Sequence, residues 1–204
     1  MRKKRGGTAM RNRSVFVALF AALISATCFI AIPTGPMQIP IVIQNMMVVL
    51  AGTVLGGTTG AASVLLFLIA GAVGLPVFSG GTSGFAKFIG PTGGFLIGYL
   101  CGALCAGLIL GKPSLDEVYT TPRMWIKTTL AVVVGSAVVY IFGIPWLASA
   151  IMRTNSMSFQ EALPGALAAG VVPFIPGAII KIVISVPLTC ALRPIAARYL
   201  NPGS

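Results

Sequence analysis

The chain has 204 residues, of which 56% are hydrophobic and only 8% are charged. Soluble domains carry about 25% charged residues, so this composition excludes a domain whose whole surface faces water. A membrane-spanning helix needs roughly 20 apolar residues. The length therefore allows one compact bundle of about five to seven spans and leaves no room for a second domain.

The net charge of +11 comes from 14 Lys and Arg against three Asp and Glu. In a soluble protein such an excess would indicate nucleic acid as a partner. Here the basic residues cluster at the ends of apolar stretches, which is how membrane proteins encode their topology. We therefore expect membrane lipids, and no nucleic acid, as partners of these charges.

We predict an all-α integral membrane protein, a compact bundle of six transmembrane helices. Residues 1–13 form a basic tail, and the apolar run after it is too long for the core of a signal peptide, so we expect it to be retained. The membrane domain is expected at 14–191, with a C-terminal tail at 192–204. The spans are expected at about 14–32, 39–57, 59–75, 92–111, 125–143 and 165–191. Turn sequences separate several of them, such as PTGP at 33–36.

The basic residues predict the orientation of the bundle. Six spans place both termini on one side, which would hold eleven of the 14 basic residues: Arg2, Lys3, Lys4, Arg5, Arg11, Arg13, Lys112, Arg123, Lys127, Arg193 and Arg198. Lys and Arg are enriched on the cytoplasmic side of membrane proteins. We therefore expect cytoplasmic termini in a multi-pass protein of the cell membrane, with residues 74–98 facing outward.

Three polar residues interrupt the expected spans. The amides of Gln44 and Asn45 need partners in a dry interior, and hydrogen bonds between helices explain them as well as ligand contact does. Lys181 is the strongest single signal, because a lysine deep in a span costs roughly 2.5–3.5 kcal/mol and usually has a function or a partner. A helix that begins near Val171 would place Lys181 near mid-membrane. A helix that opens at Pro176 would place it about 7 Å from that end, where it could snorkel outward.

The acidic residues offer no counter-charge inside the membrane. Asp116, Glu117 and Glu161 are the only acids, and all three fall in expected connections. An anionic substrate would then neutralise Lys181.

The connection GLPVFSGGTSGFAKFIGPTGGFLIG, residues 74–98, combines many glycines with aromatic side chains. It lacks the G-x-x-x-x-G-K-[ST] pattern of a phosphate-binding loop, and a flexible linker would be more polar. Aromatic rings beside exposed backbone donors suit a flat organic ligand. Irregular backbone at membrane depth survives where it lines a cavity, so we expect a lid or re-entrant loop over a binding site.

Ala18, Ala22 and Ala26 form a stripe of small residues on the first helix. Such a stripe lets helices approach closely, either within the bundle or against the helices of a partner. The chain has no histidine, and its four cysteines lie in apolar stretches. We therefore expect no metal site, no cofactor and no enzymatic activity.

Three motifs resemble one family: IPIVIQN at 39–45, PVFSGG…GF…GPTGG at 76–94 and PFIPG..IK at 173–181. They are similar to BioY, the biotin-binding membrane subunit of energy-coupling-factor (ECF) transporters, over nearly the whole chain. The resemblance implies a substrate-capture (S) subunit that binds biotin on its outer side. It also implies two ABC-type ATPases and a membrane coupling protein as partners, with the alanine stripe as the docking surface.

The resemblance also implies site residues. The glycine-rich loop corresponds to residues 80–84, with Thr82 where some members have a ligand-binding asparagine, and the embedded lysine of the family corresponds to Lys181. The chain departs from the family where Ala178 replaces an aspartate and Leu96 replaces an arginine. The expected biotin-binding residues are Lys181, Thr82, Gly81, Ser83, Gly84, Phe78, Pro91, Thr92, Phe95, Gln44 and Asn45.

Other functions lead to different expectations. Within transport, the alternatives are a stand-alone biotin carrier or facilitator, or an S subunit for another small anionic vitamin. An assembly protein would use the alanine stripe as its main interface and would have no ligand cavity. An intramembrane enzyme is disfavoured, because no histidine or acid lies in a span for general acid–base work.

Overall fold

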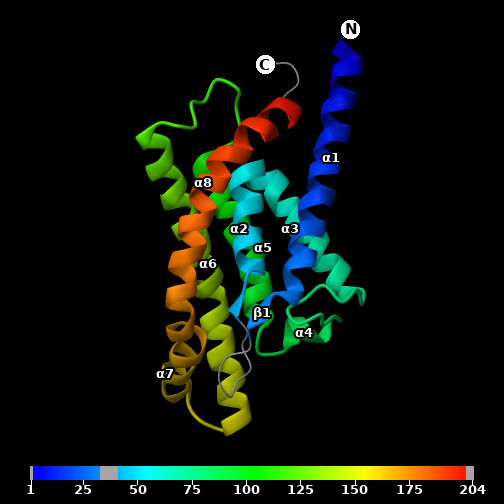
Figure 1. The fold of residues 1–204 in the computed structure, drawn as a ribbon. Helices are drawn as coiled ribbons and strands as arrows, with labels where there is room; N and C mark the ends of the chain where they lie inside the picture. The colour runs from blue at the N-terminus through cyan, green and yellow to red at the C-terminus, as the bar shows by residue number, and fades with distance from the viewer. Residues whose placement is uncertain (1, 33–40, 201–204) are drawn as a thin grey trace.

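The computed structural model describes residues 2–32 and 41–200 and is a bundle of α-helices (Figure 1). The helices are α1 (Arg2–Ala26), η1 (Thr27–Phe29), α2 (Gln44–Leu55), α3 (Gly57–Ala72), α4 (Ala86–Ile89), α5 (Gly93–Leu110), α6 (Pro122–Asn155), α7 (Phe159–Gly170), η2 (Val172–Phe174) and α8 (Ile175–Leu200), where η marks a 3₁₀ helix. Two short strands, β1 (Ala31–Ile32) and β2 (Ile41–Val42), pair antiparallel before α2 and depart from the expected all-α fold. The turn expected at 33–36 lies outside the described residues.

Four segments of the described chain are long and apolar enough to cross a membrane: Met10–Phe29, Gly93–Leu110, Pro122–Asn155 and Gly177–Leu200. α2 and α3 are shorter apolar helices. These helices overlap the six expected spans in chain order. The number of membrane crossings itself stays a prediction.

The last expected span, 165–191, is divided between two helices. α7 ends at Gly170, and the backbone leaves the helical region at Val171, where φ is −124° and ψ is −55°. η2 follows, with a proline in its first turn, and α8 begins at Ile175. Lys181 therefore lies about 9 Å along the axis from the start of α8. This position is close to that expected for a helix that opens at Pro176.

α6 is longer than the span expected at 125–143, because the helix continues through Pro145 and ends only at Asn155. A proline removes one backbone hydrogen bond but is tolerated in membrane helices when neighbouring groups compensate. Ser156, with φ of 53°, closes the helix in the left-handed conformation. The expected basic tail is helical too, since α1 begins at Arg2.

The three basic regions of the chain meet at one end of the bundle. Figure 1 shows the start of α1, the α5–α6 connection and the end of α8 at that end. Hydrogen bonds hold α1 in place there: Arg13 Nη2 donates to Thr58 Oγ1 at 3.0 Å, and Asn12 Nδ2 donates to the Tyr199 carbonyl at 3.0 Å.

Glycines allow very close packing around α5. A Cβ added at Gly98 of α5 would lie 2.8 Å from the Val139 carbonyl oxygen of α6, and one at Gly52 of α2 would overlap the backbone of Ala103. α5 therefore lies with its backbone against both α2 and α6. α8 packs on α2 and α6, and these three helices enclose the candidate site.

Candidate functional site

A small cavity lies between α2, α6 and α8. Its wall consists of Asn45, Met46, Val49, Val132, Ser136, Tyr140, Ala178, Lys181, Ile182 and Ser185. The volume is about 20 Å³, which is room for one water molecule. The lining is mainly apolar, with polar groups contributed by all three helices.

Lys181 and Asn45 meet across this cavity. Lys181 Nζ donates a hydrogen bond of 2.8 Å to Asn45 Oδ1, and the lysine is half-buried. Lys181 comes from α8 and Asn45 from α2, so the contact joins two helices that are far apart in the sequence. Two residues expected in the site are thus brought together, and the lysine head lies inside the bundle.

Gln44 has a different role from its neighbour. Its side chain is 1% exposed, and Nε2 donates to the carbonyls of Ile24 at 3.0 Å and Val77 at 2.8 Å. It therefore ties the end of α1 to the glycine-rich connection. Of the two explanations that the sequence left open, hydrogen bonding within the bundle accounts for Gln44, while Asn45 lines the cavity.

The glycine-rich connection is a tight hairpin. Phe78 N donates to the Thr82 carbonyl at 2.9 Å and Thr82 N donates back to Phe78 at 3.1 Å. Gly80 and Gly81, with φ of 72° and 70°, form the turn between them in the left-handed region that glycine tolerates. Gly80 N also donates to the Cys28 carbonyl at 2.9 Å. The hairpin is thus attached to η1, which directly follows α1.

Side chains of the hairpin contact other groups of the protein itself. Thr82 Oγ1 donates to the Ser79 carbonyl at 3.0 Å. Phe78 is 2% exposed and makes edge-on contacts with Phe67 of α3 at 5.5 Å and with Phe88 at 5.8 Å between ring centroids. Phe78 therefore anchors the connection in the core. Ser83 and Gly84, which directly follow the hairpin, are half-buried. Neither of these two residues belongs to the cavity wall described above.

The second glycine motif, residues 90–94, is fixed to α6. Trp146 Nε1 donates to the Gly90 carbonyl at 2.9 Å, and a Cβ at Gly94 would lie 2.5 Å from the Phe142 carbonyl. Pro91 is exposed and Thr92 is half-buried. This turn therefore cannot move without breaking a contact to α6.

Phe95 lies directly behind the cavity. Its ring makes an edge-on contact with Tyr140, 6.3 Å between centroids, and Tyr140 lines the cavity. The chain departs at two positions from the sequence pattern of the family that it resembles. Of these, Ala178 lines the cavity, whereas Leu96 is buried in the main core.

Three polar residues of the wall were missed in the sequence: Ser136, Tyr140 and Ser185. A spacing signal existed for all three, because Ser185 follows Lys181 by four residues and Tyr140 follows Ser136 by four. Residues four apart share a helix face. Serines and tyrosines are common in membrane helices, however, and only the position of Lys181 distinguishes this face.

Comparison with known proteins identifies the family. The model of the BioY family matches residues 1–198, nearly the full length of the chain. The chain belongs to the BioY family. The match includes the cavity helices and both glycine motifs.

Individual relatives agree with this placement. The chain is 39% identical over 173 residues to the biotin transporter BioY of Rhizobium etli, covering 84% of this chain and 87% of that protein. It is also 39% identical over 179 residues to the biotin transporter BioY of Rhodobacter capsulatus, covering 86% and 90%. Among solved structures, the S-component for biotin from an ECF-type ABC transporter superposes with a TM-score of 0.70 at 30% identity, covering 89% of this chain and 90% of that one.

Proposed function

We propose that this chain captures biotin as the S subunit of an ECF-type transporter, and that the ligand contacts Lys181 and Asn45. The observation that carries the proposal is the Lys181–Asn45 hydrogen bond in a mainly apolar cavity of a BioY-family chain. Lysines of membrane helices that face the bundle interior usually have a function or a partner, and a carboxylate or ureido oxygen of biotin would accept a hydrogen bond from Lys181. Ser136, Tyr140 and Ser185 add polar groups to the same wall.

Biotin binding requires the cavity to open. Pockets for small organic ligands measure roughly 300–1,000 Å³, whereas this cavity measures about 20 Å³. The wall residues come from α2, α6 and α8, so these helices would have to move to make room. Entry of the ligand past the glycine-rich connection would also break contacts such as Gly80 N to the Cys28 carbonyl and Trp146 Nε1 to the Gly90 carbonyl. Thr82, Gly81, Ser83, Gly84, Pro91 and Thr92 would then close over the ligand.

The orientation follows from the charges. The basic start of α1, the α5–α6 connection and the end of α8 lie at one end of the bundle, and basic residues favour the cytoplasmic side. The glycine-rich connection, residues 74–98, would then face outward. The chain would cross the cell membrane six times and would have both termini in the cytoplasm.

Active uptake would depend on partners. The chain has no G-x-x-x-x-G-K-[ST] motif of its own, so two ABC-type ATPases and a coupling protein would supply the energy, and the chain itself would not be an enzyme. Ala18, Ala22 and Ala26 are exposed on α1, while Phe20, Ala21 and Ile24 are buried against the bundle. This exposure favours the docking role of the stripe over packing within the bundle.

The proposal is tested on the purified full chain in lipid nanodiscs. Isothermal titration calorimetry should show saturable biotin binding with one site per chain, and mass spectrometry should detect biotin released from protein purified from cells. Binding of another vitamin with no response to biotin would contradict the proposed ligand. Biotin accumulation in liposomes that hold only this chain would favour a stand-alone carrier.

A further inference from the structure

A row of polar residues runs along the inner face of α8. Lys181, Ser185, Thr189 and Arg193 follow one another at intervals of four residues, so they share one helix face. Ser185, Thr189 and Arg193 are at most 1% exposed. The row begins in the cavity and ends at the α5–α6 connection, residues 111–121, about 18 Å away along the helix.

α2 provides the partners of this row. Asn45 accepts the hydrogen bond from Lys181 at 2.8 Å, and Thr53, two turns further along α2, lies beside Thr189 with 2.9 Å between the hydroxyl oxygens. The Thr53 carbonyl also accepts a hydrogen bond from Arg193 Nη1 at 2.6 Å. Polar contacts therefore join α2 and α8 both at the cavity and at the opposite end.

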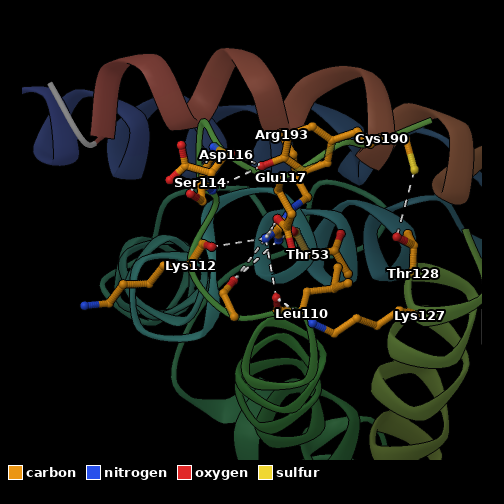
Figure 2. Close-up of polar contacts among 12 residues, drawn as sticks. Thr53, Leu110, Lys112, Ser114, Asp116, Glu117, Lys127, Thr128, Cys190 and Arg193 are labelled. Carbon is orange, nitrogen blue, oxygen red and sulfur yellow. Dashed lines mark hydrogen bonds and ion pairs between the residues drawn. The ribbon is translucent and has the colours of Figure 1, made fainter. Parts of the chain in front are cut away.

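Arg193 fixes the α5–α6 connection from inside the protein (Figure 2). Its Nη2 donates to the carbonyls of Lys112 at 3.3 Å and Gly111 at 3.4 Å, and forms an ion pair with Glu117 Oε2 at 3.2 Å. The Arg193 side chain has no exposed surface, whereas that of Glu117 is 30% exposed. A buried cation needs these partners, so a displacement of Arg193 must disturb the connection.

Ligand binding would place strain on the same pair of helices. The cavity between α2 and α8 holds about one water, so a larger ligand at Lys181 must move these helices apart there. α8 is one continuous helix from Ile175 to Leu200. Movement of α8 at Lys181 would therefore weaken the Thr53–Thr189 and Thr53–Arg193 contacts.

We propose that the polar row couples the cavity to the α5–α6 connection: ligand at Lys181 shifts α8 against α2, which loosens the hold of Arg193 on residues 111–121. Arg193 is then a positioning residue that makes occupancy of the cavity detectable at the opposite end of the molecule. The inference rests on the proposed binding of biotin at Lys181.

Linkage gives the proposal a definite sign. If ligand loosens the connection, a change that loosens the connection must strengthen ligand binding. Glu117→Gln removes the charge that pairs with Arg193 and should lower the dissociation constant for biotin roughly fivefold, at the lower end of such couplings. Asp116→Asn is the matched control, because Asp116 is exposed, whereas the ion pair with Arg193 is formed by its neighbour Glu117. It should leave the affinity unchanged.

Hydrogen exchange tests the coupling directly in the wild-type chain, in nanodiscs, with and without saturating biotin. We expect the amides of residues 111–121 to exchange faster with biotin bound. Unchanged or slower exchange there, with biotin bound, would overturn the proposal. Pro187 removes one backbone hydrogen bond of α8 between Lys181 and Thr189. If α8 bends at this point, movement at Lys181 would not reach Arg193, and the exchange of residues 111–121 would be unchanged.

Calorimetry on the same samples distinguishes a failure of the proposed function from a failure of the proposed coupling. If the wild-type chain does not bind biotin, the proposed function fails. If it binds biotin but Glu117→Gln binds with wild-type or weaker affinity, the coupling fails and the proposed function stands. The wild-type exchange measurement decides the coupling even if Glu117→Gln does not fold.

Discussion

Lys181 of α8 and Asn45 of α2 are joined by a hydrogen bond of 2.8 Å inside a cavity too small for an organic ligand. The contact gives the Lys181 ammonium group and the Asn45 amide oxygen one hydrogen bond each, in an environment where unpaired polar groups are costly. If biotin binds here, as we propose, it must compete with, or add to, a hydrogen bond that already exists. The effect of a substitution at either residue on biotin affinity is therefore the difference between its effect on the biotin-bound chain and its effect on the free chain.

The first prediction concerns Lys181. A charge-assisted hydrogen bond contributes about 1.5–3 kcal/mol, so Lys181→Ala should weaken biotin binding roughly 10- to 100-fold. Calorimetry measures the change. Lys87→Ala is the control, because Lys87 lies on α4 outside the cavity wall, and it should bind biotin like the wild type. An equal loss of biotin affinity in the two variants would show that Lys181 is not part of the binding site.

The second prediction separates two adjacent amides. Gln44→Ala would leave the buried carbonyls of Ile24 and Val77 without their donor, which costs about 1–3 kcal/mol of stability. Asn45→Ala should instead change biotin affinity and lower the unfolding temperature less. Thermal unfolding and calorimetry on both variants test this difference. If Asn45→Ala is the more destabilised and Gln44→Ala the weaker binder, the assignment of the two roles is reversed.

Some of the site could be predicted because the residues are chemically unusual for their surroundings. Lys181 and Asn45 interrupt apolar runs, and burying such groups requires a reason. Asn45 and Gln44 are neighbours in the same apolar run, so their surroundings in the sequence do not distinguish them. Adjacent helix residues point about 100° apart, and only the packing of α2 decides which one faces α8 and which one faces α1.

Other features depend on contacts that a sequence does not display. Phe78 was expected to contact ligand because aromatic residues suit a flat molecule, yet its ring is buried between Phe67 and Phe88; its ligand role stays a prediction. Arg193 was counted as one of many cytoplasmic charges. It is buried because Thr53, Glu117 and the end of α5 surround it, and these groups come from three separate parts of the chain.

The third prediction concerns the hairpin. Gly80 and Gly81 both have left-handed φ values, so an alanine at either position costs about 1–2 kcal/mol. Gly81→Ala should be the more destabilising, because its Cβ would lie 3.0 Å from the ring of Phe29, whereas no atom of residues 2–32 or 41–200 lies within 4 Å of a Cβ at Gly80. Thermal unfolding in detergent measures both effects.

Gly165→Ala provides the control for these two variants. Gly165 lies within α7 and has open space around its Cβ position, and alanine favours a helix over glycine by about 1 kcal/mol. This variant should be at least as stable as the wild type. If Gly80→Ala and Gly81→Ala were equally harmless, the left-handed turn would be contradicted.

The fourth prediction concerns the alanine stripe. Ala22 is exposed on α1, so Ala22→Leu should fold and bind biotin normally, but the larger side chain would prevent close approach of a partner helix. We expect the yield of coupling protein that co-purifies with the chain to fall roughly tenfold, as overpacking by about 1–3 kcal/mol implies. Ala137→Leu, at an exposed alanine of α6, should leave the yield unchanged. A normal complex with Ala22→Leu would exclude this face as the interface.

The fifth prediction concerns pH and the start of α7. Glu161 Oε2 accepts hydrogen bonds of 2.8 Å from both the backbone N and the Oγ of Ser158, and these bonds hold the pKa of the Glu161 carboxyl below its usual value. The ionised carboxylate therefore stabilises the first turn of α7 above the unfolded pKa. That contribution is lost as the pH falls through the lower, folded pKa.

Carbon-13 NMR titration of the Glu161 carboxyl tests this directly. In the wild type, protonation should occur at lower pH than for an unperturbed glutamate. Once Glu161 is protonated, the amides in the first turn of α7 should be less protected from exchange, relative to their intrinsic rates at the same pH. Ser158→Ala removes the hydroxyl donor and should raise the pKa toward the ordinary value, because one of the two hydrogen bonds to the carboxylate is lost. In Glu161→Gln, the protection of these amides, measured relative to their intrinsic exchange rates, should be independent of pH over the same range. An ordinary pKa in the wild type would contradict the capping arrangement.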